Sequence, residues 1–422
     1  MLTFASNLFK LIERNKINLL YFLAFSMPLQ KNLSTYLLIF VLGTSFFGIK
    51  QKKIELNLVL LPLLYALYML SLTYSENFSF KFFEQKAAFI GMPLIFLNLK
   101  PLLTNIVISR LLKSYILGCF ISVLLCFIMA IFNSISFNNG FVFSSQINPS
   151  DTFWVSAVKD GNYFFGNYFS LFHQTVYFTM FLTMAIGLLL FNKNLFTKRP
   201  LKWVLLLVFS ISVFLVSSRA GILVFLVLIF IYLINKIKKR KHTISSLVIL
   251  SIIVISFFSL NPRTKKLLNN LNSKEFFHRE NSDSFSLRLM SWDASLAVIK
   301  ENPILGVGVG DAYDELKFIY KRKRYVTPFR QRLNSHNQFL QIAVETGIFG
   351  LLIYLLLLFN IWKSKGHTHF YPFLSTVFLF IMVINSFFES VFNQYSGLLF
   401  FNFFYCLIFV ADIRSAQNTS NG

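Results

Sequence analysis

Acidic residues are scarce in this sequence, and charge of either sign is uncommon. Only 17 of the 422 residues are Asp or Glu, against 40 Lys and Arg, and charged residues make up 14% of the chain. Hydrophobic residues make up 55%, and the mean hydropathy is +0.62. A soluble protein of this length has no need for so much apolar surface. The composition therefore excludes an ordinary soluble enzyme and indicates an integral membrane protein.

Cysteine and recognisable metal-binding spacings are also lacking. The three cysteines, Cys119, Cys126 and Cys406, all lie within apolar runs, where we expect small core residues and neither disulfides nor metal ligands. The sequence has no Asp-x-Asp pair and no paired-histidine metal pattern of the His-Glu-x-x-His kind. Metal-dependent transfer chemistry therefore has little support, and we predict neither a metal nor a cofactor.

What the sequence has in plenty is continuous apolar runs, several of them close to the roughly 20 residues with which a helix spans a bilayer. They do not alternate with polar residues as the strands of a membrane β-barrel do. We therefore predict an all-α, polytopic membrane protein with about 12 transmembrane helices. The predicted spans lie approximately at 17–30, 34–49, 55–74, 87–99, 112–133, 168–191, 202–217, 220–235, 243–260, 338–361, 370–388 and 391–411.

The net charge of +23 would suggest nucleic-acid binding in a soluble protein, but much of it lies in short loops between these runs. A basic loop follows the even-numbered spans, as at 236–241. Because Lys and Arg concentrate in cytoplasmic loops, both termini are predicted in the cytoplasm, and no nucleic-acid partner is expected. The loops 134–167 and 261–337 and the turn 217–221 then lie outside. No small-residue cleavage site follows the first run, which favours a retained first helix over a signal peptide.

We predict one integrated membrane domain with helices 1–9 over 1–260, an extracytoplasmic loop over 261–337, and helices 10–12 over 338–422. No internal repeat is visible, which weakens the interpretation as an inverted-repeat transporter.

An amphipathic helix is predicted within the large loop, over 286–300. Its apolar residues share one helical face, which would lie on the membrane surface or against the bundle: Leu289, Trp292, Leu296 and Ile299. Asn302-Pro303 would end this helix. The glycine run that follows, from Gly306 to Asp311, is interpreted as a turn rather than as a phosphate-binding loop.

Three polar residues carry the candidate chemistry. Arg219 stands in the turn between two apolar runs, Arg288 on the predicted loop helix, and His336 where the large loop returns to apolar sequence. Each also has an ordinary interpretation: arginines contact lipid headgroups, and a lone histidine is often an interfacial residue. Together they would all face outward, with no acidic neighbour adjacent in sequence. Two arginines can bind a diphosphate, and a neutral imidazole can accept the proton of an attacking hydroxyl.

Other polar residues could contact a substrate. Lys321 and Arg322 belong to a basic run that would bind either substrate or lipid headgroups, and His173 would line a cavity in the sixth span or simply pack there. Gln338 follows directly on the histidine motif and is a further candidate for substrate binding.

Two carboxylates at the edges of the apolar runs are predicted to support the site. Glu345 in the tenth span and Glu389 at the end of the eleventh could orient an arginine or the histidine, or serve as structural counter-ions.

Four segments resemble the O-antigen ligase/polymerase family of bacterial membrane proteins. They are SSRAG at 217–221, the run from Arg288 that ends in NPILGVGVGD, SHNQFLQIAVETGIFG from Ser335, and FFESVFNQYSG from Phe387. The resemblance covers the second half of the chain. The first half matches only in hydropathy, apart from the segment at His173.

The resemblance implies a metal-independent, inverting glycosyltransferase at the periplasmic face of the inner membrane. The donor would be a glycan on undecaprenyl pyrophosphate, and the acceptor a sugar hydroxyl of the lipid A–core in a ligase or the end of another glycan in a polymerase. By motif, Arg219 and Arg288 would hold the pyrophosphate and His336 would activate the acceptor. Membrane lipids would surround the protein. The residues also leave open a transporter of lipid-linked glycans.

Overall fold

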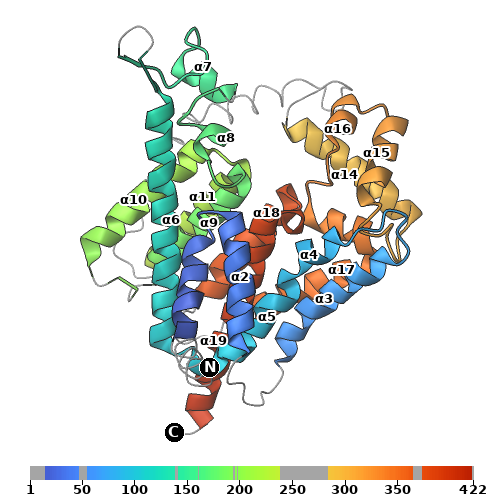
Figure 1. Ribbon diagram of the computed structural model, residues 1–422, viewed down its shortest axis with the longest axis horizontal. Coiled ribbons are helices and arrows are strands. Elements are labelled where there is room, and N and C mark those ends of the chain that lie inside the picture. The colour runs from blue at the N-terminus through green and yellow to red at the C-terminus, as the bar shows by residue number, and fades with distance from the viewer. Residues whose placement is uncertain are drawn as a thin grey trace, which may run out of the picture. The chain divides into compact units, whose positions relative to one another are not determined.

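The computed structural model describes residues 15–46, 55–137, 141–159, 161–192, 195–196, 198–237, 284–364 and 373–420, which are mostly helical (Figure 1). After helical residues 15–26, the first half contains α2 (Lys31–Ser45), α3 (Leu56–Leu72), α4 (Lys81–Lys86), α5 (Ala88–Leu99), η1 (Lys100–Leu102), α6 (Asn105–Asn133), the antiparallel strands β1 (Ile135–Ser136) and β2 (Val142–Phe143), α7 (Phe153–Val158), α8 (Gly166–Phe169) and α9 (Thr175–Phe191). The second half contains α10 (Arg199–Val216), α11 (Arg219–Ile237), α14 (Ser284–Glu301), α15 (Ala312–Arg322), α16 (Val326–Gln331), α17 (Gln338–Lys363), α18 (Leu374–Phe388), η3 (Val391–Asn393) and α19 (Tyr395–Ser420). The all-α prediction is confirmed.

Three of the described helices are long and apolar enough to cross a membrane by length and composition, namely α6, α10 and α17. Six shorter apolar helices lie near other predicted spans: α3, α5 with η1, α9, α11, α18 and α19. The ninth predicted span, 243–260, lies outside the described residues. The number of crossings and the sidedness of the loops stay predictions. The three cysteines are buried and free, as expected.

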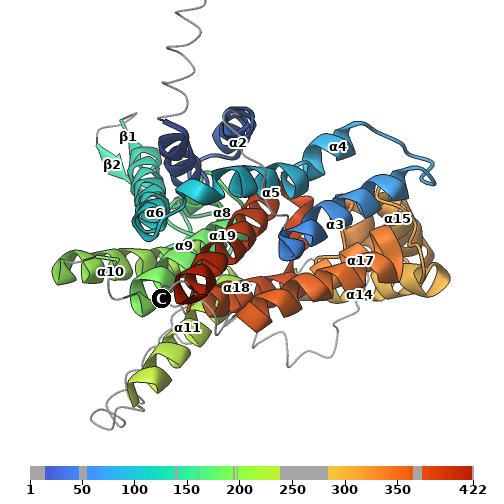
Figure 2. The ribbon, with the colours of Figure 1, turned by 90° about the horizontal axis from the view of Figure 1, so that it is seen from below.

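The chain divides into two compact units. Unit 1 contains residues 1–23, 35–108 and 274–422, and unit 2 contains 24–34 and 109–273. In unit 1, α17 packs against α3, α14 and α18, while α5 packs against α3 and α19. Figures 1 and 2 both show α14 and α15 beside α17 and α3. In unit 2, α9 packs against α10 and α11.

The tenth predicted span is α17, and it is broken at Gly347, where φ is 64° and ψ is −156°. The turn after α14 fills the break. The Gly308 amide donates to the Glu345 carbonyl (3.1 Å), and the Ile348 amide donates to the Pro303 carbonyl (3.1 Å). Because the turn satisfies peptide groups that the helix leaves unpaired, the break is tolerated in apolar surroundings. The glycine run is thus a turn, as predicted, and it fastens the large loop to α17.

The predicted loop helix is α14, but its most buried residues are not those of the predicted apolar face. Its buried residues include Met290, Ala294 and Val298, with small serines between them. Leu296, on the predicted face, is 57% exposed. Small residues allow a close approach to α17, whereas Leu289, Trp292 and Ile299 are only half-buried. The predicted face therefore packs against the protein in part, because Ile299 contacts the core beside α15 and the Trp292 indole bonds to the His336 carbonyl. Its contact with the membrane surface stays a prediction.

Candidate active site

His336 lies directly before α17, in a backbone conformation uncommon for a residue with a side chain, with φ 44°. The Asn334 side-chain oxygen accepts a hydrogen bond from the His336 amide (2.9 Å), and the Trp292 indole donates to the His336 carbonyl (3.4 Å). Asn337 caps α17 by accepting from two amides of its first turn (2.9 and 3.2 Å). The loop is therefore fixed on both sides of the histidine.

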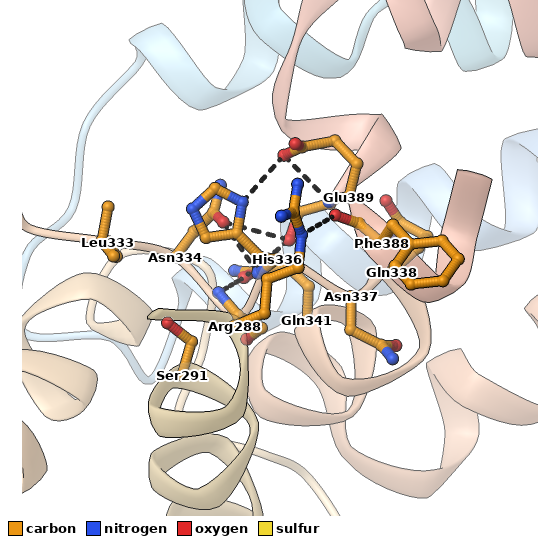
Figure 3. A network of polar contacts seen from close by, with 12 residues as sticks. Arg288, Ser291, Leu333, Asn334, His336, Asn337, Gln338, Gln341, Phe388 and Glu389 are labelled. Atoms are coloured by element: carbon orange, nitrogen blue, oxygen red, sulfur yellow. Dashed lines mark hydrogen bonds and ion pairs between the residues drawn. The ribbon is translucent and has the colours of Figure 1, made fainter. Parts of the chain in front are cut away.

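The imidazole of His336 faces Glu389, the residue that follows α18 (Figure 3). Nδ1 of the histidine lies 3.4 Å from a carboxylate oxygen of Glu389. The Ser390 amide donates to the same oxygen (3.2 Å). Although burial opposes ionisation, the contact with His336 and the positive charge of Arg288 hold the pKa of the Glu389 carboxyl below its ordinary value. Glu389 is therefore an ionised partner for the imidazole.

Arg288, near the start of α14, joins this pair. Its Nε donates to the Phe388 carbonyl (2.9 Å), and an Nη donates to the Ser284 carbonyl (2.9 Å). The fold therefore provides the acidic neighbour that Arg288 and His336 lack in sequence, since Glu389 acts electrostatically on both. We call Arg288, His336 and Glu389 the entry cluster, after its place at the start of α17 (Figure 3).

Glu345, the second supporting carboxylate, reaches His336 only through other residues. The Gln341 side chain donates to a carboxylate oxygen of Glu345 (2.7 Å), and its oxygen accepts from the Ser335 amide (2.9 Å). Ser335 directly precedes the histidine. Glu345 is itself 2% exposed. Of the two predicted supporting residues, the structure brings Glu389 into contact with the histidine and places Glu345 behind it.

Gln338 is fully buried, and its side-chain oxygen accepts a hydrogen bond from the Phe392 amide (2.6 Å). This bond ties the start of α17 to η3. Substrate binding by Gln338 stays a prediction, and the observed contact is structural.

Lys321 and Arg322 lie exposed in the last turn of α15. Arg322 forms an ion pair with Glu301 at the end of α14 (2.9 Å). No contact recorded among the described residues joins either side chain to the entry cluster, so their part in substrate binding also stays a prediction.

Arg219 is the first residue of α11 and is half-buried in unit 2. It follows Ser217, whose φ of 53° turns the chain after α10, and the Ser218 hydroxyl accepts from the Gly221 amide (3.3 Å). The turn is thus a capped helix start, with the arginine at its N-terminus. The convergence of Arg219 with Arg288 and His336, which belong to unit 1, stays a prediction.

His173 precedes the helix that was predicted to contain it. The sixth span was expected from residue 168, whereas α9 begins at Thr175. The aromatic run before it is apolar enough to resemble a span, but it forms the separate one-turn helix α8. His173 is 7% exposed and lies against the Phe181 ring, with centroids 5.0 Å apart. Burial lowers the pKa of His173 to about 4, so this side chain is neutral at physiological pH.

Three polar residues around the site were missed from the sequence: Lys86, Asn334 and Ser390. Lys86 is 3% exposed and bonds to the η3 segment, while the Ser390 hydroxyl donates to the Asn334 side chain (3.3 Å). A signal existed for Lys86, because it lies in a loop predicted to be outside, where the positive-inside rule expects few lysines. Asn334 and Ser390 carry no such signal.

Comparison with known families gives one match, over residues 203–355, to a family described as O-antigen ligase. No curated protein matches the chain. The matched residues run from α10 into α17 and contain Arg219, Arg288 and His336, whereas Glu389 and the FFESVFNQYSG segment lie beyond them. The resemblance drawn from the motifs is confirmed over these residues, which match the O-antigen ligase family.

Proposed function

We propose that this protein is a glycosyltransferase of the O-antigen ligase type, which transfers a glycan from undecaprenyl pyrophosphate to a hydroxyl of a lipid A–core sugar at the periplasmic face of the inner membrane. The family match supports an enzyme of the ligase/polymerase kind. The observation that carries the finer proposal is the contact of His336 with ionised Glu389 beside Arg288.

His336 acts as the general base in this proposal. With Nδ1 directed at the Glu389 carboxylate, the tautomer that carries its hydrogen on Nδ1 is favoured. Nε2 is then the nitrogen that accepts a proton. A base held in one orientation by a carboxylate contributes about 10²–10⁴-fold to such a reaction.

The transfer step follows from these roles. The acceptor oxygen attacks the anomeric carbon of the glycan while the bond from that carbon to the diphosphate oxygen breaks. The bonding electrons leave with undecaprenyl pyrophosphate, and the hydroxyl proton passes to Nε2 of His336. Arg288, together with Arg219, stabilises the charge that develops on the leaving diphosphate. In this proposal the guanidinium groups supply the positive charge, and the direct attack inverts the anomeric centre.

The product identifies the activity. Purified protein in detergent is given a glycan on undecaprenyl pyrophosphate and a lipid A–core acceptor, without any ion gradient. We expect the glycan on the lipid A–core and free undecaprenyl pyrophosphate. A longer glycan that remains on its carrier would overturn the ligase assignment in favour of a polymerase. If the folded protein transfers no glycan but moves the lipid-linked glycan across the membrane of vesicles, the protein is a transporter.

A further inference from the structure

Lys86 is enclosed by protein, which is rare for a lysine unless its charge is compensated. It is the last residue of α4 and is 3% exposed. Its ammonium group donates to the Phe392 carbonyl (2.8 Å) and to the Asn393 side chain (3.4 Å), and it lies 4.7 Å from the centroid of the Tyr68 ring. These neighbours solvate the ammonium group, but none of them is negatively charged.

Glu345, on α17, is the carboxyl group that acts electrostatically on Lys86. Burial lowers the pKa of Lys86, and the charge of Glu345 opposes this effect. Tyr68 and Asn393 face the Glu345 carboxyl as well. Removing one member of a buried pair of charges leaves the other uncompensated, so the two are expected to act as a unit. We call Lys86 and Glu345 the inner pair.

The inner pair is connected to two members of the entry cluster, His336 and Glu389. On one side, Gln341 connects Glu345 (2.7 Å) to the amide of Ser335, the neighbour of His336 (2.9 Å). On the other side, Lys86 holds the Phe392 carbonyl of η3, three residues after Glu389. The two sides meet again where Ser390 donates to Asn334.

We propose that the inner pair is a positioning device for the active site: Lys86 and Glu345 hold the loop of His336 and the segment of Glu389 so that imidazole and carboxylate stay in contact. The pair itself does not touch the substrate. This inference rests on the proposed function, and it adds that a buried lysine in α4 controls the rate of transfer through His336.

The principal experiment is a double-mutant cycle with Lys86→Met, Glu345→Gln and both together. We expect Lys86→Met to lower kcat about 10–100-fold with KM for the lipid-linked donor unchanged, because the uncompensated carboxylate shifts α17. The double variant should be at least about fivefold faster than Lys86→Met, since it buries no lone charge. Losses that simply multiply would overturn the proposal, as would a rise in KM with unchanged kcat. Lys81→Met is the matched control, since Lys81 is exposed at the other end of α4.

A second readout separates this inference from the proposed function. Modification of His336 by diethyl pyrocarbonate, followed by mass spectrometry, reports how firmly the imidazole is held without requiring transfer. We expect Lys86→Met to speed this modification several-fold and Lys81→Met to leave it unchanged. If the wild-type protein transfers no glycan but shows this pattern, the proposed function fails and the positioning role stands. If the wild-type protein is active and Lys86→Met changes neither kcat nor the rate of His336 modification, the positioning role fails.

If Lys86→Met does not fold, Gln341→Met is the variant that tests the proposal. It keeps both charges of the inner pair and removes the connection from Glu345 to Ser335. Slower transfer and faster modification of His336 in the folded variant support the proposal, and wild-type values for both overturn it.

Discussion

Two histidines near the ends of helices in this protein lie in opposite surroundings. His336, in unit 1, faces an ionised carboxylate 3.4 Å away and has Arg288 as a further charged neighbour of that carboxylate. His173, in unit 2, lies against the Phe181 ring (5.0 Å), and burial lowers its pKa to about 4. The His336 side chain is 25% exposed and His173 is 7% exposed, so the two histidines differ in burial as well as in their charged neighbours.

The difference lies in what each environment does to the imidazole. A carboxylate beside Nδ1 stabilises the charge that the ring gains when it accepts a proton. At His173, burial and the charge of Lys31 oppose that charge and outweigh the hydrogen bonds with the Pro28 and Met27 backbone, so the ring stays neutral. The carboxylate therefore suits the role of base that we propose for His336, whereas His173 remains a neutral part of the packing before α9.

The largest expected effect separates the two histidines directly. His336→Gln should lower kcat about 10²–10⁴-fold, because the general base is lost while the loop keeps a polar side chain. His173→Gln should change kcat less than about threefold, because a neutral buried ring contributes packing and not proton transfer. Rates are measured with purified, folded variants at saturating donor. Equal losses in the two variants would refute the distinction between the sites.

A somewhat smaller effect is expected at Arg288, whose Nε bond to the Phe388 carbonyl orients its guanidinium. Arg288→Ala should lower kcat about 10²–10³-fold, as expected for removal of a group that stabilises developing charge. Arg288→Lys should recover less than about a tenth of the rate, because an ammonium group cannot make the paired hydrogen bonds of a guanidinium. Full recovery by lysine would show that only net charge matters at this position.

Glu389→Gln tests the carboxylate beside Nδ1 of His336, which distinguishes this histidine from His173. We expect kcat to fall about 10–100-fold, because the neutral amide stabilises the protonated imidazole less. The variant should also lose part of the acid sensitivity of folding. The pKa of Glu389 is lowered in the folded protein, so its ionised form contributes stability above the ordinary carboxyl pKa, and this contribution is lost as pH falls through the lowered value. Thermal unfolding in detergent at pH 7 and pH 4 measures this, and an unchanged difference between the two pH values contradicts it.

Hydropathy predicted the positions of the described apolar helices, since an apolar run of sufficient length indicates a buried or membrane helix whatever its neighbours. It failed where the chain departs from regular helix inside an apolar run. The composition around Gly347 does not predict the break of α17. The break depends on hydrogen bonds with a turn more than 35 residues earlier in the chain, such as the bond from the Ile348 amide to the Pro303 carbonyl. Hydropathy also missed the late start of α9, because the chain departs from regular helix inside the apolar run that precedes it.

The sequence identified single candidate residues of the site but not their partners. Arg288 and His336 stood out because a charge or an imidazole at the edge of an apolar run is costly. Their partners could not be assigned, because the fold brings together residues about 100 positions apart, as in the bond from Arg288 to the Phe388 carbonyl. Lys86 was passed over because a lysine beside an apolar run is usually a topology signal, although its place in a loop predicted to be outside argued against that interpretation. Its enclosure shows that it is part of the packed protein.

The smallest expected effect concerns His173 and appears in stability rather than in rate. The folded protein holds the pKa of His173 at about 4, below the ordinary value of 6.5. The unfolded chain therefore binds a proton first as pH falls below 6.5, and folding stability decreases from there until the folded value is reached. In His173→Gln this decrease should shrink by about 1–2 kcal/mol between pH 6.5 and pH 4.5. Thermal unfolding of both proteins in the same detergent measures it, with His173→Phe as a second variant that cannot titrate. If wild type and both variants lose stability equally over this range, His173 is protonated in the folded protein, and the contrast with His336 must rest on the carboxylate of Glu389 alone.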